Sequence, residues 1–474
     1  TKVPHLAIVP TILHYTRPGD LVLDGFCGSG MTGVAAQYCG SAPPEYRREL
    51  EARWRAEGRP MPEWGARRAI LNDLSPAATF IAAGYNLPFD VPAFAREARR
   101  ILDEVDAELG WMYETLHTDG VTKGRINYTV WSEIFTCPNC TAEVNFVAEA
   151  LDSVTKRVHD LFPCPHCGVE LTKDNLERLF DFDVDPATGQ SWRHIRLRPV
   201  LIEYSVGPER YEKSPDATDH AILERIKQLP LPPEVPSNAF PIAQMYHGSR
   251  LAPKGFTHIH HLFLPRPAQS LAALWRNANA VEHVRLRGML VFWAEQAIWT
   301  SSILNRYRPT GYSQVGQYLT GVYYVPSQHA EVSPHYVLDG KALRMASGFD
   351  RHLAIAEATT TNTGDCARCP ILDDTIDYIF TDPPFGENIY YADLNFLVES
   401  WHRVITDAAP EAIVDETKHK DAQDYQDLMR RCFAEYFRVL KPGRWMTVVF
   451  SNSSNAIWRA IQEAMGTAGF VVAD

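Results

Sequence analysis

The chain has 474 residues, of which 45% are hydrophobic, 22% charged and 11% aromatic, and its formal net charge is −12. This is the composition of an ordinary globular protein, and the length predicts two or three domains. The acidic balance excludes a protein coated in basic charge, so a nucleic-acid partner would need a local basic groove or a second subunit. No apolar run approaches the ~18 residues of a membrane helix and no signal-peptide pattern is present, so we expect no membrane association.

Cysteine usage indicates a reducing compartment. The nine cysteines are an odd number and include three C-x-x-C pairs. This pattern favours metal binding over disulfides. We therefore expect a cytoplasmic protein.

A glycine-rich turn after a short apolar strand is the first chemical signal in chain order. Residues 21–24 (Leu-Val-Leu-Asp) predict the strand, and the turn at residues 25–33 opens a helix. Gly28 and Gly30 allow the backbone to approach a ligand closely, and the start of the helix adds free N–H groups and a positive dipole end. Such a turn alone is a generic nucleotide-binding signal.

A second short strand is predicted at residues 69–72, and Asp73 and Leu74 follow it. An acid at the end of the second strand commonly binds ribose hydroxyls. Asp73 is therefore a candidate cofactor ligand, with a helix-capping acid as the alternative. It lies much further from Asp24 than the ~20 positions of a plain dinucleotide unit. We attribute the excess to a charged helical surface insertion within residues 41–65.

The tetrad Asp382-Pro383-Pro384-Phe385 follows a predicted buried strand at residues 378–380. Two consecutive prolines fix φ and remove two N–H donors, so the chain must leave the sheet in a rigid extended turn. The turn holds a carboxylate, a carbonyl and an aromatic ring at the carboxyl end of a strand, where open α/β sheets bind ligands. The alternative is a turn that only closes a strand.

The two motifs together resemble those of the S-adenosylmethionine-dependent DNA amino-methyltransferases, which methylate exocyclic amines of bases. The glycine turn is similar to the family's Asp-x-Phe-x-Gly-Ser-Gly-x-Thr loop, and the tetrad is similar to its catalytic motif. The resemblance covers about residues 1–90 and 355–474. It implies an α/β fold with a Rossmann-like, mostly parallel sheet and helices on both faces, interrupted by a zinc-ribbon and helical insertion.

The resemblance also implies roles for individual residues. The glycine loop would wrap the methionine part of S-adenosylmethionine, and Asp365 would meet the adenine amine. Pro4 and His5 are expected either beside the cofactor or as a helix cap. The implied cofactor contacts are Asp24, Gly25, Phe26, Cys27, Gly28, Ser29, Gly30, Thr32, Asp73, Leu74 and Asp365, and the implied catalytic residues are Asp382, Pro383, Pro384 and Phe385.

The tetrad suits amine methylation on chemical grounds. An exocyclic base amine is a poor nucleophile because its lone pair is delocalised into the ring. The Asp382 carboxylate and a backbone carbonyl at Pro383 can bind both amine hydrogens and aim the lone pair at the sulfonium methyl. Phe385 would face the base, which must be flipped out of a duplex. Asn388 and Tyr391 are expected at the rim of the pocket.

Two C-P-x-C knuckles, Cys137/Cys140 and Cys164/Cys167, predict a closed structural zinc site of four thiolates. The third pair, Cys366 and Cys369, has no second pair to complete a tetrahedron, so we expect it to be incidental. A metal site at residues 258–261 (His-Ile-His-His) is less favoured than a half-exposed strand.

The predicted organisation divides the methyltransferase domain in two. Its cofactor-binding half is 1–90 and its catalytic half is 351–474, with a helical connection at 91–125, a zinc-ribbon insertion at 126–205 and a mostly helical insertion with possible target recognition at 206–350. Helices are expected at residues 268–280 and 284–304. A final strand is expected at 470–472, with one further antiparallel strand of the family either lying past Asp474 or missing.

These patterns favour a methyltransferase that acts on adenine N6 in double-stranded DNA, with cytosine N4 as the nearest variant. The expected setting is bacterial restriction-modification or phage defence, with possible protein partners. The alternatives are an RNA base amino-methyltransferase and a cofactor-binding subunit of a larger DNA-modification complex.

Overall fold

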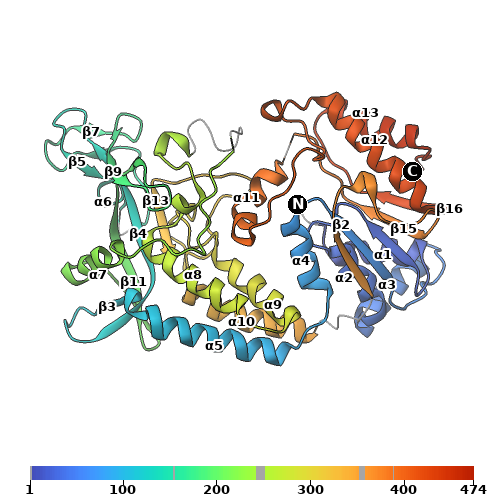
Figure 1. Ribbon diagram of the computed structural model, residues 1–474, viewed down its shortest axis with the longest axis horizontal. Coiled ribbons are helices and arrows are strands. Elements are labelled where there is room, and N and C mark those ends of the chain that lie inside the picture. The colour runs from blue at the N-terminus through green and yellow to red at the C-terminus, as the bar shows by residue number, and fades with distance from the viewer. Residues whose placement is uncertain (1–2, 153–154, 242–250, 352–357, 388, 474) are drawn as a thin grey trace. The chain divides into compact units, whose positions relative to one another are not determined.

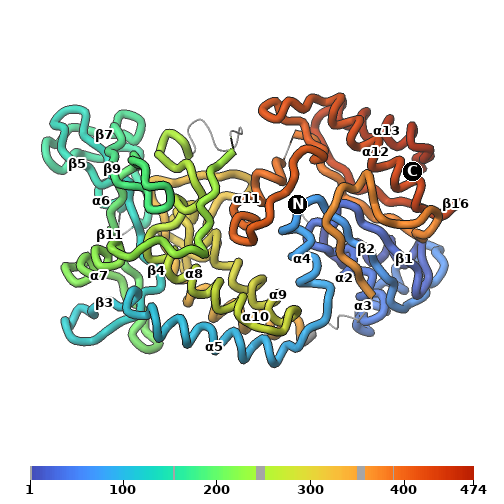
Figure 2. Tube along the Cα trace, viewed as in Figure 1, coloured from blue at the N-terminus to red at the C-terminus, as the bar shows by residue number. Residues whose placement is uncertain are grey.

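A computed structural model describes residues 3–473, apart from 153–154, 242–250, 352–357 and 388. The chain divides into two compact units. The first joins residues 1–90 to residues 348–474, and the second comprises residues 91–347. In Figure 2 the blue amino-terminal segment and the orange-to-red carboxyl-terminal segment fold together within the first unit.

The first unit is built on a parallel sheet with the strand order β14-β2-β1-β15-β16. The prediction of a parallel α/β sheet is thereby confirmed. The outer strand β14 has the sequence Thr-Thr-Thr-Asn-Thr and was not predicted, because it lacks the apolar residues that mark a buried strand. The bounds are β1 Leu21–Asp24, β2 Arg68–Asp73, β14 Thr359–Thr363, β15 Ile376–Thr381 and β16 Leu440–Val448.

Alternation along the strands gives the sheet two apolar faces. Tyr378 and Phe380 of β15 pack with α1, α2 and α3, whereas Ile379 packs with α12 and α13. Figure 1 shows these two groups of helices on opposite sides of the sheet. The helices of this unit are α1 His5–Tyr15, α2 Met31–Ser41, α3 Pro44–Ala56, α4 Pro76–Asn86, α11 Tyr391–His402, α12 Ala422–Val439 and α13 Asn455–Ala468.

The predicted strand at residues 470–472 is wrong. The chain there has no regular secondary structure after α13 ends, and Val471 and Val472 are exposed. A strand of apolar residues needs a sheet edge to pair with, and among the described residues none pairs with this segment.

The second unit contains an antiparallel sheet with the order β12-β11-β4-β13. The long central strand β4 also pairs with β3, β5 and β8. The sheet therefore draws strands from three of the predicted segments, 91–125, 126–205 and 206–350. Its strands are β3 Glu114–Leu116, β4 Lys123–Thr136, β5 Glu143–Asn145, β8 Glu177–Arg178, β11 Leu197–Val206, β12 Glu209–Lys213 and β13 Gln328–Val332.

Two small hairpins and several helices complete this unit. The helix expected over 284–304 is wrong in length, because α9 ends at Ala294 and short turns follow. Within the described residues, no helix combines the length and apolar character needed to cross a membrane. The hairpins are β6 Phe162–Pro163 with β7 Glu170–Leu171, and β9 Phe180–Val184 with β10 Ser191–Ile195; the helices are α5 Val91–Leu109, α6 Phe146–Ala150, α7 Ala217–Lys227, α8 Pro265–Asn279, α9 Val284–Ala294 and α10 Pro334–Arg351.

Candidate active site

The loops after β1, β2, β14 and β15 meet at one edge of the parallel sheet, around a cavity of about 380 Å³. Parallel strands end at a common edge, so residues distant in sequence converge there. Gly30, Pro383 and Phe385 belong to the same loops but do not line the cavity. The predicted residues that line it are Asp24, Gly25, Phe26, Cys27, Gly28, Ser29, Thr32, Asp73, Leu74, Asp365, Asp382 and Pro384.

The glycine turn after β1 requires glycine at two positions. Gly28 and Gly30 have φ angles of 48° and 77°, which L side chains rarely adopt. A Cβ on Gly30 would also lie 2.9 Å from the Cα of Ala82 in α4. The Gly28 N–H donates to Asp73 Oδ2 at 2.9 Å, so the first loop is tied to the second.

Asp24 is buried at the end of β1 with its carboxylate turned back onto its own loop. It accepts from the Thr32 hydroxyl and, at 3.2 Å, from the Phe26 N–H. Burial, together with the nearby carboxylates of Asp73 and Asp382, raises the pKa of Asp24 to about 7. The Thr32 hydroxyl and Phe26 N–H oppose this shift.

Asn72 holds three of the loops in place and was missed in the sequence. Its side-chain amide donates to the Gly364 carbonyl at 3.0 Å and to the Gly25 carbonyl at 3.4 Å. The Gly364 N–H donates to the Asp73 carbonyl at 2.9 Å. Asp365 follows directly and caps a short 3-10 helix by accepting from the Ala367 N–H. Only its place directly before Asp73 could have marked Asn72.

Tyr436 of α12 connects the glycine turn to the tetrad and was also missed. Its buried hydroxyl accepts from the Gly25 N–H at 3.1 Å and shares a 2.9 Å hydrogen bond with the Thr381 hydroxyl. A Cβ on Gly25 would lie 2.3 Å from this hydroxyl oxygen and 2.6 Å from Cys366 Sγ. Gly25 is therefore required for close packing under the loop. An aromatic residue on an amphipathic helix carries no sequence signal for such a role.

The tetrad leaves β15 with an acceptor that has no donor. Asp382 Oδ1 is buried and has no hydrogen-bond partner among the described residues. Burial raises the pKa of Asp382 to about 6. The Pro384 carbonyl accepts from the Tyr425 hydroxyl at 2.7 Å, which fixes the turn from below. A buried acceptor without a donor is costly in a folded protein unless a ligand supplies the donor.

Phe385 lies beside the cavity in an aromatic group. Its ring packs edge-on against Phe450 at 5.3 Å, and Phe450 packs edge-on against Trp458 at 5.1 Å. The Phe385 carbonyl accepts from the Asn452 side chain at 2.6 Å. The ring is thus held by the segment after β16.

The rim includes residues from α11 and from the start of the chain. Tyr391 lines the cavity, and Asn388 lies outside the described residues. Val3 and Ile8 line the cavity, whereas Pro4 and His5 do not. Pro4 is the N-cap residue of α1, and His5 is the first residue of that helix.

The cavity wall is acidic. The carboxylates that line it are Asp24, Asp73, Asp365, Asp382 and Glu411, and no lysine, arginine or histidine is among the described lining residues. Burial raises the pKa of Asp73 to about 6, although N–H groups of Ser75 and Gly28 donate to it. Such a wall favours a ligand that brings positive charge.

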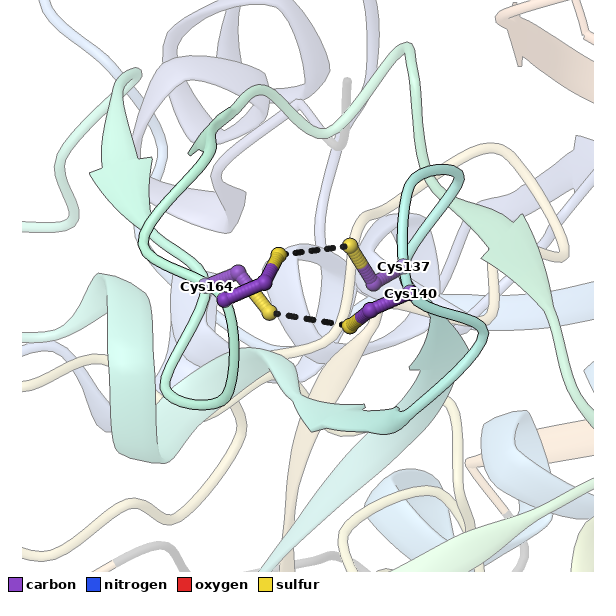
Figure 3. Close-up of side chains that lie close together, drawn as sticks. Cys137, Cys140 and Cys164 are labelled. Carbon is purple, nitrogen blue, oxygen red and sulfur yellow. Dashed lines mark hydrogen bonds between the residues drawn. The ribbon is translucent and has the colours of Figure 1, made fainter.

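The four predicted metal ligands come together in the second unit. Ligand atoms of Cys137, Cys140, Cys164 and Cys167 lie within 4.8 Å of one another and could hold a metal ion. The sulfur atoms of Cys137 and Cys167 lie 3.8 Å apart, as do those of Cys140 and Cys164. Figure 3 shows the side chains of Cys137, Cys140 and Cys164 turned toward this cluster. Four thiolates at ~2.3 Å from Zn²⁺ in a tetrahedron have sulfur–sulfur distances of about 3.8 Å. The donor set therefore fits zinc.

The two knuckles share one backbone pattern. In each, the residue four positions on donates to the carbonyl of the first cysteine at 3.0 Å, from Thr141 to Cys137 and from Gly168 to Cys164. Thr141 and Gly168 both have positive φ angles. This repetition is a local property of the C-P-x-C sequence, which is why the pairing could be predicted.

The histidines at 260 and 261 do not lie on a half-exposed strand, and that prediction is wrong. Both are buried in a 3-10 helix, where their Nε2 atoms lie 3.0 and 2.7 Å from the Asp185 carboxylate. His261 Nδ1 accepts N–H groups of Thr257 and His258, so its proton is on Nε2 and points to Asp185. The ligand atoms of Asp185, His260 and His261 lie within 4.8 Å of one another, so these three residues are also a group that could hold a metal ion.

Comparison with known proteins finds a similarity at the amino-terminal end of the chain. Residues 1–42 match the model of the family described as DNA methylase (N6_N4_Mtase). The matched segment contains α1, β1, the glycine turn and α2, and it does not reach the tetrad. No curated protein and no solved structure matches the chain. The amino-terminal segment is thus similar to DNA methylases.

Proposed function

We propose that this chain transfers a methyl group from S-adenosylmethionine to the exocyclic amine of a flipped DNA base, with adenine N6 as the favoured acceptor. The observation that carries the proposal is the unpartnered Asp382 oxygen beside the cavity of the glycine turn. The match of residues 1–42 to DNA methylases supports the reaction class independently of the tetrad.

The acidic wall suits the cofactor. S-adenosylmethionine supplies an electrophilic methyl group on a positively charged sulfonium. The carboxylates of Asp24 and Asp73, whose pKa values are raised to about 7 and about 6, would be stabilised in their charged form by a cation. We assign Asp24, Phe26, Gly28 and Asp73 to hold the methionine and ribose parts and Asp365 to hold the adenine amine.

In the tetrad, Asp382 and the Pro383 carbonyl would accept the two hydrogens of the base amine. The Pro384 carbonyl already accepts from Tyr425, so it is the neighbouring carbonyl that we assign to the amine. Two fixed acceptors localise the nitrogen lone pair and orient it, which is catalysis by positioning and preorganised electrostatics. Phe385 would stack on the base.

We further propose that the four-cysteine site holds Zn²⁺ in a structural role. Four thiolates occupy the tetrahedron and leave no open position for catalysis. The site lies in the second unit, whereas every residue assigned to methyl transfer belongs to the first.

The function is tested by incubating the full chain with S-adenosylmethionine and, separately, unmethylated bacterial DNA and bulk RNA. Nucleoside mass spectrometry then identifies the product. The proposal predicts N6-methyladenine in DNA, and N4-methylcytosine would correct only the base. Product in RNA alone would overturn the DNA assignment. Absence of product in both, with the cofactor bound, would indicate a subunit that needs a partner.

A further inference from the structure

The second unit has a groove of about 870 Å³ beside the hairpin of β6 and β7. One wall is formed by residues 306–310, Tyr324 and residues 326–328. The other is formed by residues 158–161 and 172–174, which flank the hairpin carrying Cys164 and Cys167. All of its described lining residues lie between Phe146 and Gln328.

Three cations line this groove without ion-pair partners. Lys173, Arg306 and Arg308 form no salt bridge with a described carboxylate, unlike Arg178, Arg196 and Arg266 of the same unit. Lys173 and Arg308 are exposed, and Lys173 Nζ lies 5.2 Å from the centre of the Phe146 ring. Asp160 and Asp174 also line the groove and are exposed. The basic character is therefore concentrated on the wall with the two arginines.

The arginine wall is preorganised. The buried side chain of Gln314 accepts from the Arg308 N–H at 2.8 Å and donates to the Arg308 carbonyl at 2.7 Å. Asn305, also buried, donates to the carbonyls of Gln314 and Ala330 at 2.9 Å. The backbone of Arg308 is thus fixed from inside, while its guanidinium donates a long hydrogen bond of 3.4 Å to the Gln317 side chain. The fixed backbone lowers the entropy cost of binding an anion, and the guanidinium remains available to contact it.

We propose that this groove binds the sugar–phosphate backbone of the DNA duplex that carries the target base. The proposal rests on the proposed function, since that function supplies DNA as the polyanion. Tyr324, which is exposed in the same groove, adds a ring next to the cations, a combination that suits nucleic acid. The groove would supply the local basic surface that a chain with a net charge of −12 needs.

The test measures binding of the full chain to a fluorescent duplex by anisotropy over a range of salt concentrations. The double variant K173A/R308A removes two cations and leaves Arg306, whose Nε holds the Gln317 carbonyl. The expected result is weaker binding, with the slope of log K against log salt smaller by about 2, because each phosphate contact contributes roughly one counterion. Thermal unfolding should be unchanged.

The double variant K341A/R344A is the matched control, because it also removes two positive charges. Lys341 and Arg344 lie on α10 of the same unit, form no ion pair with a described residue and do not line the groove. The control should leave the affinity for the duplex and the slope of log K against log salt unchanged. An equal loss of affinity in the control would show that net charge alone causes the effect, and this would overturn the proposal.

Methyl transfer by the wild-type chain, measured in parallel, separates this inference from the function. If the wild-type chain methylates DNA and the double variant binds the duplex with unchanged affinity and slope, the groove proposal alone is overturned. A wild-type chain that binds no duplex overturns both. The same titration is repeated with a fluorescent RNA, and a double variant that loses RNA binding but keeps duplex binding overturns the choice of DNA.

Discussion

At the scale of single residues, the cavity brings together carboxylates whose charged forms are disfavoured by burial. Asp24, Asp73 and Asp382 have raised pKa values because burial penalises their charged forms. Their state near neutral pH therefore depends on what occupies the cavity, and this gives two measurable consequences.

Methyl transfer should fall as the pH drops through about 6. Burial raises the pKa of Asp382 to about 6, so its carboxylate is ionised above that value and protonated below it. Protonation removes an acceptor for the amine hydrogens, so the rate at saturating cofactor and DNA declines on the acid side. A pH–rate profile checks this. A rate that stays constant from pH 8 to pH 5 would contradict the role of Asp382.

Cofactor binding should release protons near pH 6.5. Asp24 and Asp73 have pKa values of about 7 and about 6, so they are partly protonated at that pH. A bound cation lowers the pKa of both and drives deprotonation, so the affinity for S-adenosylmethionine weakens as the pH falls. Calorimetry in buffers of different ionisation enthalpy measures the release. Asp24→Asn should reduce the release, and proton uptake would contradict the account.

At the scale of elements, α12 supports the site from beneath the sheet. Tyr436 connects the glycine turn to Thr381, and Tyr425 fixes the tetrad through the Pro384 carbonyl. One helix face thus places both the cofactor loop and the catalytic turn. The capping box at Asp421 and Asp424 fixes the helix start.

Tyr425→Phe should slow methyl transfer by about five-fold, since a hydrogen bond contributes about 1 kcal/mol and 1.4 kcal/mol corresponds to a factor of ten. The affinity for S-adenosylmethionine should be unchanged, because Tyr425 contacts the tetrad and not the glycine turn. Tyr211→Phe, in the second unit, is the control. A lower single-turnover rate in Tyr425→Phe, with unchanged cofactor binding, would support the role of Tyr425. An equal loss of rate in both variants would contradict it.

The elements also show why part of the site could be predicted and part could not. The glycine turn and the tetrad carry their geometry locally, in positive φ angles and paired prolines, so their positions were readable from the sequence. Asn72, Tyr436 and Tyr425 act through tertiary contacts with partners hundreds of residues away or on another element, and no local pattern marks them. The Thr-rich strand β14 was missed because its place in the sheet depends on pairing with β2.

At the scale of the whole molecule, the candidate active site and the candidate metal site lie in different units. The cavity and tetrad belong to the first unit, and the thiolate cluster and the basic groove belong to the second. The unit boundary near residue 90 lies where the first half of the predicted methyltransferase domain ends. The sheet of the second unit depends on pairing of β13 with β4, and sequence spacing carries no information on such long-range register.

Removal of the metal should destabilise the second unit and leave the cavity intact. Cys137→Ser takes away one thiolate of the cluster, so the bound zinc, expected at one ion per chain by mass spectrometry, should be lost. Protection of β5 and β6 from hydrogen exchange should fall, while cofactor binding stays unchanged. Cys369→Ser, in the third C-x-x-C pair, is the control and should retain the metal. Full zinc content in Cys137→Ser would contradict the assignment.

The most direct test of the central claim compares methyl transfer by wild type and Asp382→Asn at equal cofactor occupancy. The amide keeps the side-chain volume but replaces an acceptor with a donor that opposes the amine hydrogens. Asp374→Asn is the control, because Asp374 is exposed at the other end of β15, where its positive φ also suits asparagine. The account predicts a loss of about 100-fold or more for Asp382→Asn alone. A rate within two-fold of wild type would contradict it.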